Sequence, residues 1–84
     1  MYRVLLERAA EKHLARLSSG IHGRVIAAIQ SLATNPRPRG CRKLAGSKHD
    51  WRIRVDNYRV VYETADEIHV VRVNRVRHRR EVYR

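Results

Sequence analysis

Residues 51–62 read Trp-Arg-Ile-Arg-Val-Asp-Asn-Tyr-Arg-Val-Val-Tyr, and this stretch decides the fold. Apolar or aromatic side chains occupy every second position on each side of Asp56-Asn57, which is the period of a strand with one buried face. Asn and Asp tolerate left-handed backbone angles better than most residues, so Asp56-Asn57 is typical of a two-residue hairpin turn. The stretch therefore predicts two antiparallel strands, 51–55 and 58–62, joined by a tight turn.

The same turn fixes which side chains share the other face of the hairpin. The register that gathers the apolar residues on one face places Arg54 opposite Arg59, with Arg52 diagonal to Arg59. Like charges directly opposite each other are destabilising, and neither Asp56 nor Glu63 is placed between these arginines. The hairpin therefore predicts an arginine patch that costs stability unless an anion occupies it. This patch is the strongest functional signal in the sequence.

Upstream of the hairpin, the pattern predicts one strand and two helices. Residues 2–6 alternate with period two, as in a short strand. Residues 9–17 place apolar side chains at i, i+4 and i+7, which indicates an amphipathic helix. Residues 18–20, Ser-Ser-Gly, break this helix and offer an N-cap for a second one. Apolar residues repeat at helical spacing through 21–32 until Asn35-Pro36 stops the helix, so two antiparallel helices joined by a tight turn are expected.

The remaining segments complete an α+β fold. Residues 35–50 contain two prolines, two glycines and five cations, so we expect a loop there. Residues 68–73 predict a third strand, whereas the tail 74–84 is too charged to assign. The expected order is an N-terminal strand, two antiparallel helices and a three- to four-stranded, mainly antiparallel sheet, within a single domain over residues 1–84.

Composition and charge point to a negatively charged partner. The chain has 84 residues, of which 43% are hydrophobic, and a formal net charge of +11. A charge this large attracts polyanions over long distances and is typical of nucleic-acid-binding domains. The charge is also clustered, because residues 72–84 contain six arginines and a single acid, Glu81.

The cysteine and histidine content indicates the cellular compartment and limits which cofactors we expect. Cys41 is the single cysteine, which excludes an intramolecular disulfide and fits a reducing cytoplasm. No apolar run reaches the length of about 18 residues that a membrane helix needs, and early charges argue against a signal peptide. His13, His22 and His69 show no zinc-site spacing with Cys41, so we expect neither a metal nor another cofactor.

Four segments together resemble the RelE/ParE toxin superfamily and span nearly the whole chain. They are Lys43-Leu-Ala-Gly46, Trp51-Arg-Ile-Arg-Val55, Tyr58-Arg-Val-Val-Tyr62 and Val76-Arg-His-Arg-Arg-Glu-Val-Tyr-Arg84. The order of predicted elements also matches that superfamily. The resemblance implies a RelE-like fold, the toxin of a type II toxin–antitoxin pair, and three partners: a RelB-like antitoxin, the ribosome and mRNA.

The resemblance also implies a reaction and its residues. RelE-like members cleave mRNA in the ribosomal A site, where a 2′-hydroxyl attacks the adjacent phosphate and the 5′-oxygen leaves. The matching catalytic positions are Arg52, Arg54, Arg59, either Arg77 or His78, and Tyr83. Two departures stand out. Lysines often stand where this chain has Arg52 and Arg54, and the chain ends at Arg84 with no room for the C-terminal helix of some relatives.

The chemistry of these side chains suggests their roles. Arginine effectively never loses its proton, so Arg52, Arg54 and Arg59 are phosphate clamps and transition-state stabilisers rather than bases. His78 titrates near neutrality and is the preferred proton-transfer residue, with Arg77 or Arg79 stabilising the leaving group. Tyr83 can stack on a nucleobase. Electrostatic RNA contacts are expected from Lys43, Lys48, Arg79 and Arg80.

Two alternatives to the endonuclease remain open. One is a ParE-like protein of the same fold that inhibits DNA gyrase and cleaves no RNA, which the lack of an obvious general base favours. The other is a non-catalytic basic RNA-binding module. Each allows an acidic, partly disordered antitoxin that wraps the helices and covers the arginine face.

Overall fold

The computed structural model describes residues 1–82, with the side chains of residues 1–80. The elements follow in the order β1 (Arg3–Leu6), α1 (Arg8–Ala15), α2 (Ser19–Ser31), β2 (Arg42–Lys43), β3 (Asp50–Val55), β4 (Tyr58–Ala65), the 3-10 turn η1 (Asp66–Ile68), β5 (Val70–His78) and α3 (Arg79–Val82). The α+β architecture expected from the sequence is confirmed.

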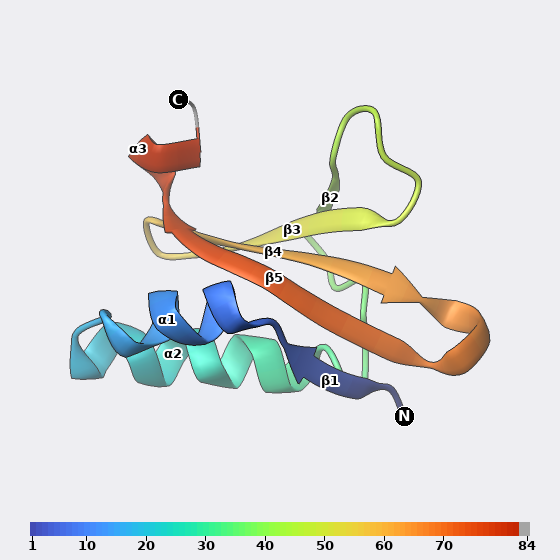
Figure 1. Ribbon diagram of the computed structural model, residues 1–84, viewed down its shortest axis with the longest axis horizontal. Helices are drawn as coiled ribbons and strands as arrows, with labels where there is room; N and C mark the ends of the chain where they lie inside the picture. Colours follow the sequence, from blue (N-terminus) through green and yellow to red (C-terminus); the bar gives the residue numbers. More distant parts are fainter. Residues whose placement is uncertain (83–84) are drawn as a thin grey trace.

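One sheet organises the molecule, with strand order β1-β5-β4-β3-β2. β1 runs parallel to β5, and every other neighbouring pair is antiparallel. Helices α1 and α2 cover one face of this sheet, called here the inner face, and α3 stands over the opposite, outer face (Figure 1). The buried core lies between the inner face and the two helices; its largest fully buried side chains are Tyr62, Leu32, Val25, Val60, Val71 and Val73.

The predicted hairpin is confirmed in its register and in its turn. Trp51 pairs with Tyr62, Ile53 with Val60 and Val55 with Tyr58, so the alternating apolar residues all lie on the inner face. Asp56 adopts a left-handed φ of 54°, as the turn requires.

A β-bulge in β5 decides which of its side chains face outward. Val61 of β4 pairs with Arg75 and Tyr62 pairs with Val73, which leaves Asn74 as the extra residue. Both Val73 and Val76 are therefore buried in the core although they are three positions apart. Without the extra residue, strand alternation would turn the residues after Asn74 to the wrong faces.

The N-terminal segment holds this bulge in place. The Asn74 Nδ2 donates to the Glu7 carboxylate at 2.7 Å, and the Glu7 backbone N–H donates to the Val73 carbonyl at 2.9 Å. The Val76 backbone N–H donates to Nδ1 of His13 on α1 at 3.1 Å. A histidine side chain thus satisfies a backbone donor of β5 beyond the point where β1 ends.

The main differences from the sequence prediction lie in the third long strand, in the loop 35–50 and in the tail. The third long strand begins at Val70 rather than Ile68, because Ile68 belongs to η1, where it is 71% exposed, and His69 turns the chain with a left-handed φ of 52°. The strand continues to His78, into the tail that had no assignment. The expected loop 35–50 contains the two-residue strand β2. A one-turn helix, α3, also forms where the resemblance left no room for one.

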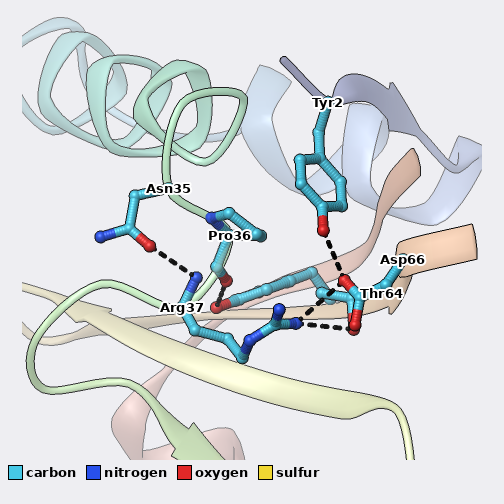
Figure 2. Close-up of polar contacts among 7 residues, drawn as sticks. Tyr2, Asn35, Pro36, Arg37, Thr64 and Asp66 are labelled. Atoms are coloured by element: carbon cyan, nitrogen blue, oxygen red, sulfur yellow. Dashed lines mark hydrogen bonds and ion pairs between the residues drawn. The ribbon is translucent and has the colours of Figure 1, made fainter. Parts of the chain in front are cut away.

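A polar cluster ties the segment after α2 to the far end of the sheet (Figure 2). The buried Tyr62 hydroxyl donates to the Pro36 carbonyl at 2.6 Å. Arg37 forms an ion pair with Asp66 at 3.1 Å, and the Tyr2 hydroxyl donates to the same carboxylate at 2.6 Å. These bonds join β1, β4 and η1 to the connection that leads to β2.

Replacing Tyr62 with Phe should lower the free energy of unfolding by about 1 kcal/mol, because the buried Pro36 carbonyl loses its donor. Chemical denaturation measures this change. Tyr58→Phe is the matched control, since the Tyr58 hydroxyl makes no hydrogen bond within the described part of the chain. Equal effects of the two substitutions would contradict the assignment.

Hydrogen bonds from Tyr2 and Arg37 lower the pKa of Asp66 below its ordinary value, and the bond from Tyr2 has the larger effect. A lowered folded-state pKa adds stability that is present above the unfolded-state pKa and is lost as the pH falls through the folded-state pKa. Stability measured between about pH 5 and pH 2 should therefore fall less steeply in Asp66→Asn than in the wild type. The difference should be about 1 kcal/mol or less, since the pair is half-exposed. Glu67→Gln is the matched control, because it removes a carboxylate of the same turn that makes neither of these hydrogen bonds.

Candidate nucleic-acid interface

Three arginines lie side by side across three adjacent strands on the outer face. Arg54 of β3 pairs with Arg59 of β4, and Arg59 pairs with Arg77 of β5. Strand alternation places the first two on this face, and the Asn74 bulge brings the third into line with them. We call Arg54, Arg59 and Arg77 the arginine row. Directly opposed like charges repel, so the row favours an anionic ligand.

A second line of basic residues lies next to the arginine row. Arg42 of β2 pairs with Arg52 of β3, which pairs with Val61 of β4, and Val61 in turn pairs with Arg75 of β5. Arg52 is thus diagonal to Arg59, as the sequence predicted. Arg75 was not singled out from the sequence, because the bulge before it breaks the alternation that would have revealed its register.

The carboxylates of the sheet are bound at the margins of this surface. The ion pairs described in the structure join Arg24 to Asp56 at 2.6 Å, Arg37 to Asp66 at 3.1 Å and Arg72 to Glu63 at 3.2 Å. Asp56 and Glu63 therefore each have a basic partner outside the arginine row.

Arg59 is at the centre of the row and is only 4% exposed. Its Nη1 donates to the Arg79 carbonyl at 3.4 Å, which connects the row to α3. The Nε of Arg77 is buried and has no hydrogen-bond partner among the described residues. A buried guanidinium nitrogen is costly when it has no acceptor, so the position of Arg77 favours a ligand that carries negative charge.

A shallow basin of about 410 Å³ lies between the hairpin turn and α3. Its lining is basic and comes from the ends of β3, β4 and α3: Arg54, Asp56, Asn57, Tyr58, Arg59, Arg79 and Arg80. The Arg79 backbone N–H donates to the Asn57 carbonyl at 2.7 Å, which fixes α3 against the turn. The basin can hold a phosphate group with guanidinium groups on several sides.

The structure separates Arg77 from His78, which the sequence left as alternatives. Arg77 joins the arginine row, whereas His78 pairs with Tyr58 and contacts its ring edge-on at 5.2 Å between centroids. Tyr58 packs against the inner-face core, so the His78 ring is turned away from the row. The His78 Nδ1 also accepts the Arg80 backbone N–H at 3.3 Å. The preferred proton-transfer residue is therefore not brought together with Arg52, Arg54 and Arg59.

The other predicted RNA-binding residues are dispersed. Lys43 is exposed on β2 opposite Trp51, and Lys48 is exposed in the loop before β3. Arg79 and Arg80 are exposed on α3 at the basin. Tyr83 lies outside the described residues.

In the part of the chain that the structure describes, no three His, Cys, Asp or Glu side chains are placed to share a metal ion. Its helices are all too short or too polar to cross a lipid bilayer.

The fold matches solved structures of RelE toxins. Archaeal RelE from the RelE–RelB complex of Pyrococcus horikoshii is 26% identical with a TM-score of 0.83, covering 93% of this chain and 94% of that one. The RelBE2 complex of Mycobacterium tuberculosis matches at 26% identity and a TM-score of 0.81, with coverage of 92% and 96%. The isolated Escherichia coli RelE toxin matches at 29% identity and a TM-score of 0.82, with coverage of 99% and 92%.

These similarities define the class of the protein as a type II toxin of the RelE/ParE superfamily. Within that class, the model of the ParE toxin of type II toxin–antitoxin system, parDE, matches residues 4–83. The chain therefore belongs to the ParE toxin family. No curated protein matches the sequence.

A polyanion that fills the basin should stabilise the folded protein. At tripolyphosphate concentrations tenfold above its dissociation constant, the melting temperature should rise by about 5 °C. Arg54→Gln should reduce this rise, because it removes an exposed member of the arginine row. Arg3→Gln, on β1 away from the row, should not reduce it. A rise that is equal in both variants would contradict a site at the row.

Proposed function

We propose that this toxin is a ribosome-dependent endonuclease that cleaves mRNA in the A site. The observation that carries the proposal is the arginine row, in which Arg54, Arg59 and Arg77 lie in register on one face. Three guanidinium groups at one place can bind the oxygens of a single phosphodiester together, whereas basic residues spread over a surface cannot. The similarity to RelE structures over nearly the full chain supports the same activity.

The row would act by stabilising charge. When a 2′-hydroxyl attacks the adjacent phosphorus, the P–O5′ bond breaks, leaving a 2′,3′-cyclic phosphate and a 5′-hydroxyl. One proton leaves the 2′-oxygen and one reaches the 5′-oxygen, while negative charge grows on the phosphoryl oxygens. Guanidinium groups bind such oxygens in bidentate fashion and remain charged throughout. Arg77 thus replaces His78 as the tail residue that we assign to the reacting phosphate.

The proton transfers need groups other than the row, because arginine is effectively always protonated. His78 would have to leave Tyr58 and the Arg80 backbone N–H to serve as acid or base. We assign Tyr83 to the substrate, where it stacks on a base beside the cut.

We also propose that a RelB-like antitoxin neutralises this toxin in the cytoplasm. The matched proteins from Pyrococcus horikoshii and Mycobacterium tuberculosis were solved as toxin–antitoxin complexes. A net charge of +11 fits an acidic partner that covers the arginine row. The ribosome and mRNA are the other partners in this proposal.

A second candidate function is inhibition of DNA gyrase without RNA cleavage. It is favoured by the family match, since the model over residues 4–83 is that of ParE toxins. The position of His78 away from the row is also consistent with it, because the histidine that we prefer for proton transfer is then not beside Arg54, Arg59 and Arg77.

Mapping mRNA 5′ ends after brief expression tests the proposed activity. New ends confined to translated reading frames are expected for the wild type. Arg54→Ala should reduce cleavage on translating ribosomes about a hundredfold, as expected for loss of one group that stabilises transition-state charge. Arg3→Ala is the matched control on β1 and should cut like the wild type.

Two results would overturn the endonuclease. If Arg54→Ala and Tyr83→Ala both cleave mRNA as well as the wild type does, the proposed site does not carry the reaction. Absence of new ends, together with inhibition of supercoiling by purified gyrase, would establish the second candidate. RNA binding with neither cleavage nor growth arrest would instead indicate a non-catalytic module.

A further inference from the structure

One acidic residue stands at the edge of the proposed phosphate-binding basin. Among the described residues that line it, Asp56 is the single carboxylate, and the other charged members are four arginines: Arg54, Arg59, Arg79 and Arg80. It lies in the turn between β3 and β4, two positions from Arg54 and three from Arg59. A carboxylate has the charge and the oxygen geometry to occupy a guanidinium site meant for phosphate.

Helix α2 supplies the ion-pair partner of this carboxylate. The Arg24 Nε donates to Oδ2 of Asp56 at 2.6 Å. α2 covers the inner face of the sheet, whereas α3 stands over the outer face (Figure 1). The basin is lined by Arg79 and Arg80 of α3 and by no residue of α2 among those described. Arg24 projects from the helix beside Val25, which is fully buried in the core, so the helix packing sets the position of the guanidinium.

We propose that Arg24 is a positioning residue that keeps the Asp56 carboxylate out of the anion-binding basin. The inference deepens the proposed function and rests on it only in requiring that the basin binds the phosphates of RNA. Without Arg24, the carboxylate of the turn would be free to rotate toward the arginines and compete with the ligand.

Competition of this kind is strong because the competitor is tethered. A group on the same chain reaches a nearby site at an effective concentration on the order of millimolar, whatever the protein concentration. A simple stabilising role explains the pair less well, because the two side chains are 61% and 44% exposed. Ion pairs this exposed contribute little to folding stability.

A double-mutant cycle separates positioning from structure. The probe is a fluorescein-labelled single-stranded hexaribonucleotide at low salt, titrated with the wild type, Arg24→Ala, Asp56→Asn and the double variant. Arg16→Ala is the matched control, since it removes one exposed positive charge from the helical layer without an acidic partner in the described ion pairs. Thermal melting of each variant verifies that it is folded.

The expected result is a conditional loss of affinity. Arg24→Ala should raise the dissociation constant about threefold to tenfold beyond the effect of Arg16→Ala, because the released carboxylate competes. Asp56→Asn should bind as tightly as the wild type or more tightly. Adding Asp56→Asn to Arg24→Ala should remove the excess loss, and Arg24→Lys, which can still hold the carboxylate, should retain near wild-type affinity.

Two outcomes would overturn the inference. If Arg24→Ala and Arg16→Ala weaken binding equally, Arg24 contributes only its overall charge. If Asp56→Asn alone weakens binding as much as Arg24→Ala does, the ion pair acts as a clamp on the turn. A wild type that binds no oligonucleotide also refutes it, since there is then no site to protect.

The proposed function is tested by a separate measurement. Mapping of mRNA 5′ ends reports on cleavage, whereas the cycle reports on binding by the basin. A wild type that binds the oligonucleotide but cuts no mRNA would refute the endonuclease and leave the role of Arg24 to be decided by the cycle.

Discussion

Burial of the inner face of the sheet is the constraint on which the rest of the structure depends. Val60 and Tyr62 of β4 and Val73 and Val76 of β5 are buried against the two helices, and their positions fix the register of the three central strands. A slip of one residue would move every arginine of the outer face into the core, at a cost that no ion pair could recover. The arginine row is therefore a consequence of apolar packing on the opposite side of the same strands.

Much of this arrangement could be predicted from the sequence because the decisive pattern is local. The alternation on both sides of Asp56-Asn57 gave the hairpin, its register and the opposition of Arg54 to Arg59. The extent of β5 could not be read, because Asn74 interrupts the period at the point where the charged tail begins. β2 is two residues long in a segment rich in proline and glycine, so its only signal is its pairing with β3.

The site was predictable only where it lies on the hairpin. Arg77 and His78 are neighbours in sequence, so strand alternation places them on opposite faces of the sheet. Which of the two lies on the outer face depends on the Asn74 bulge, and the sequence did not reveal that bulge. The contact between Arg24 and Asp56 joins a helix to a turn, and no sequence pattern within either segment predicts it. Interactions of this kind depend on how α2 crosses the sheet, and that packing angle is a property of the assembled core.

The parallel pairing of β1 with β5 has a consequence for the order of biosynthesis. β1 is made well before β5, its hydrogen-bonding partner, so the sheet closes only after β5 has emerged from the exit tunnel. Contacts that are so distant along the chain form late and slowly. Because β5 also supplies Arg77, a nascent chain lacks the complete arginine row until β5 has emerged. The basic surface of the sheet is therefore assembled later than most of the residues that form it.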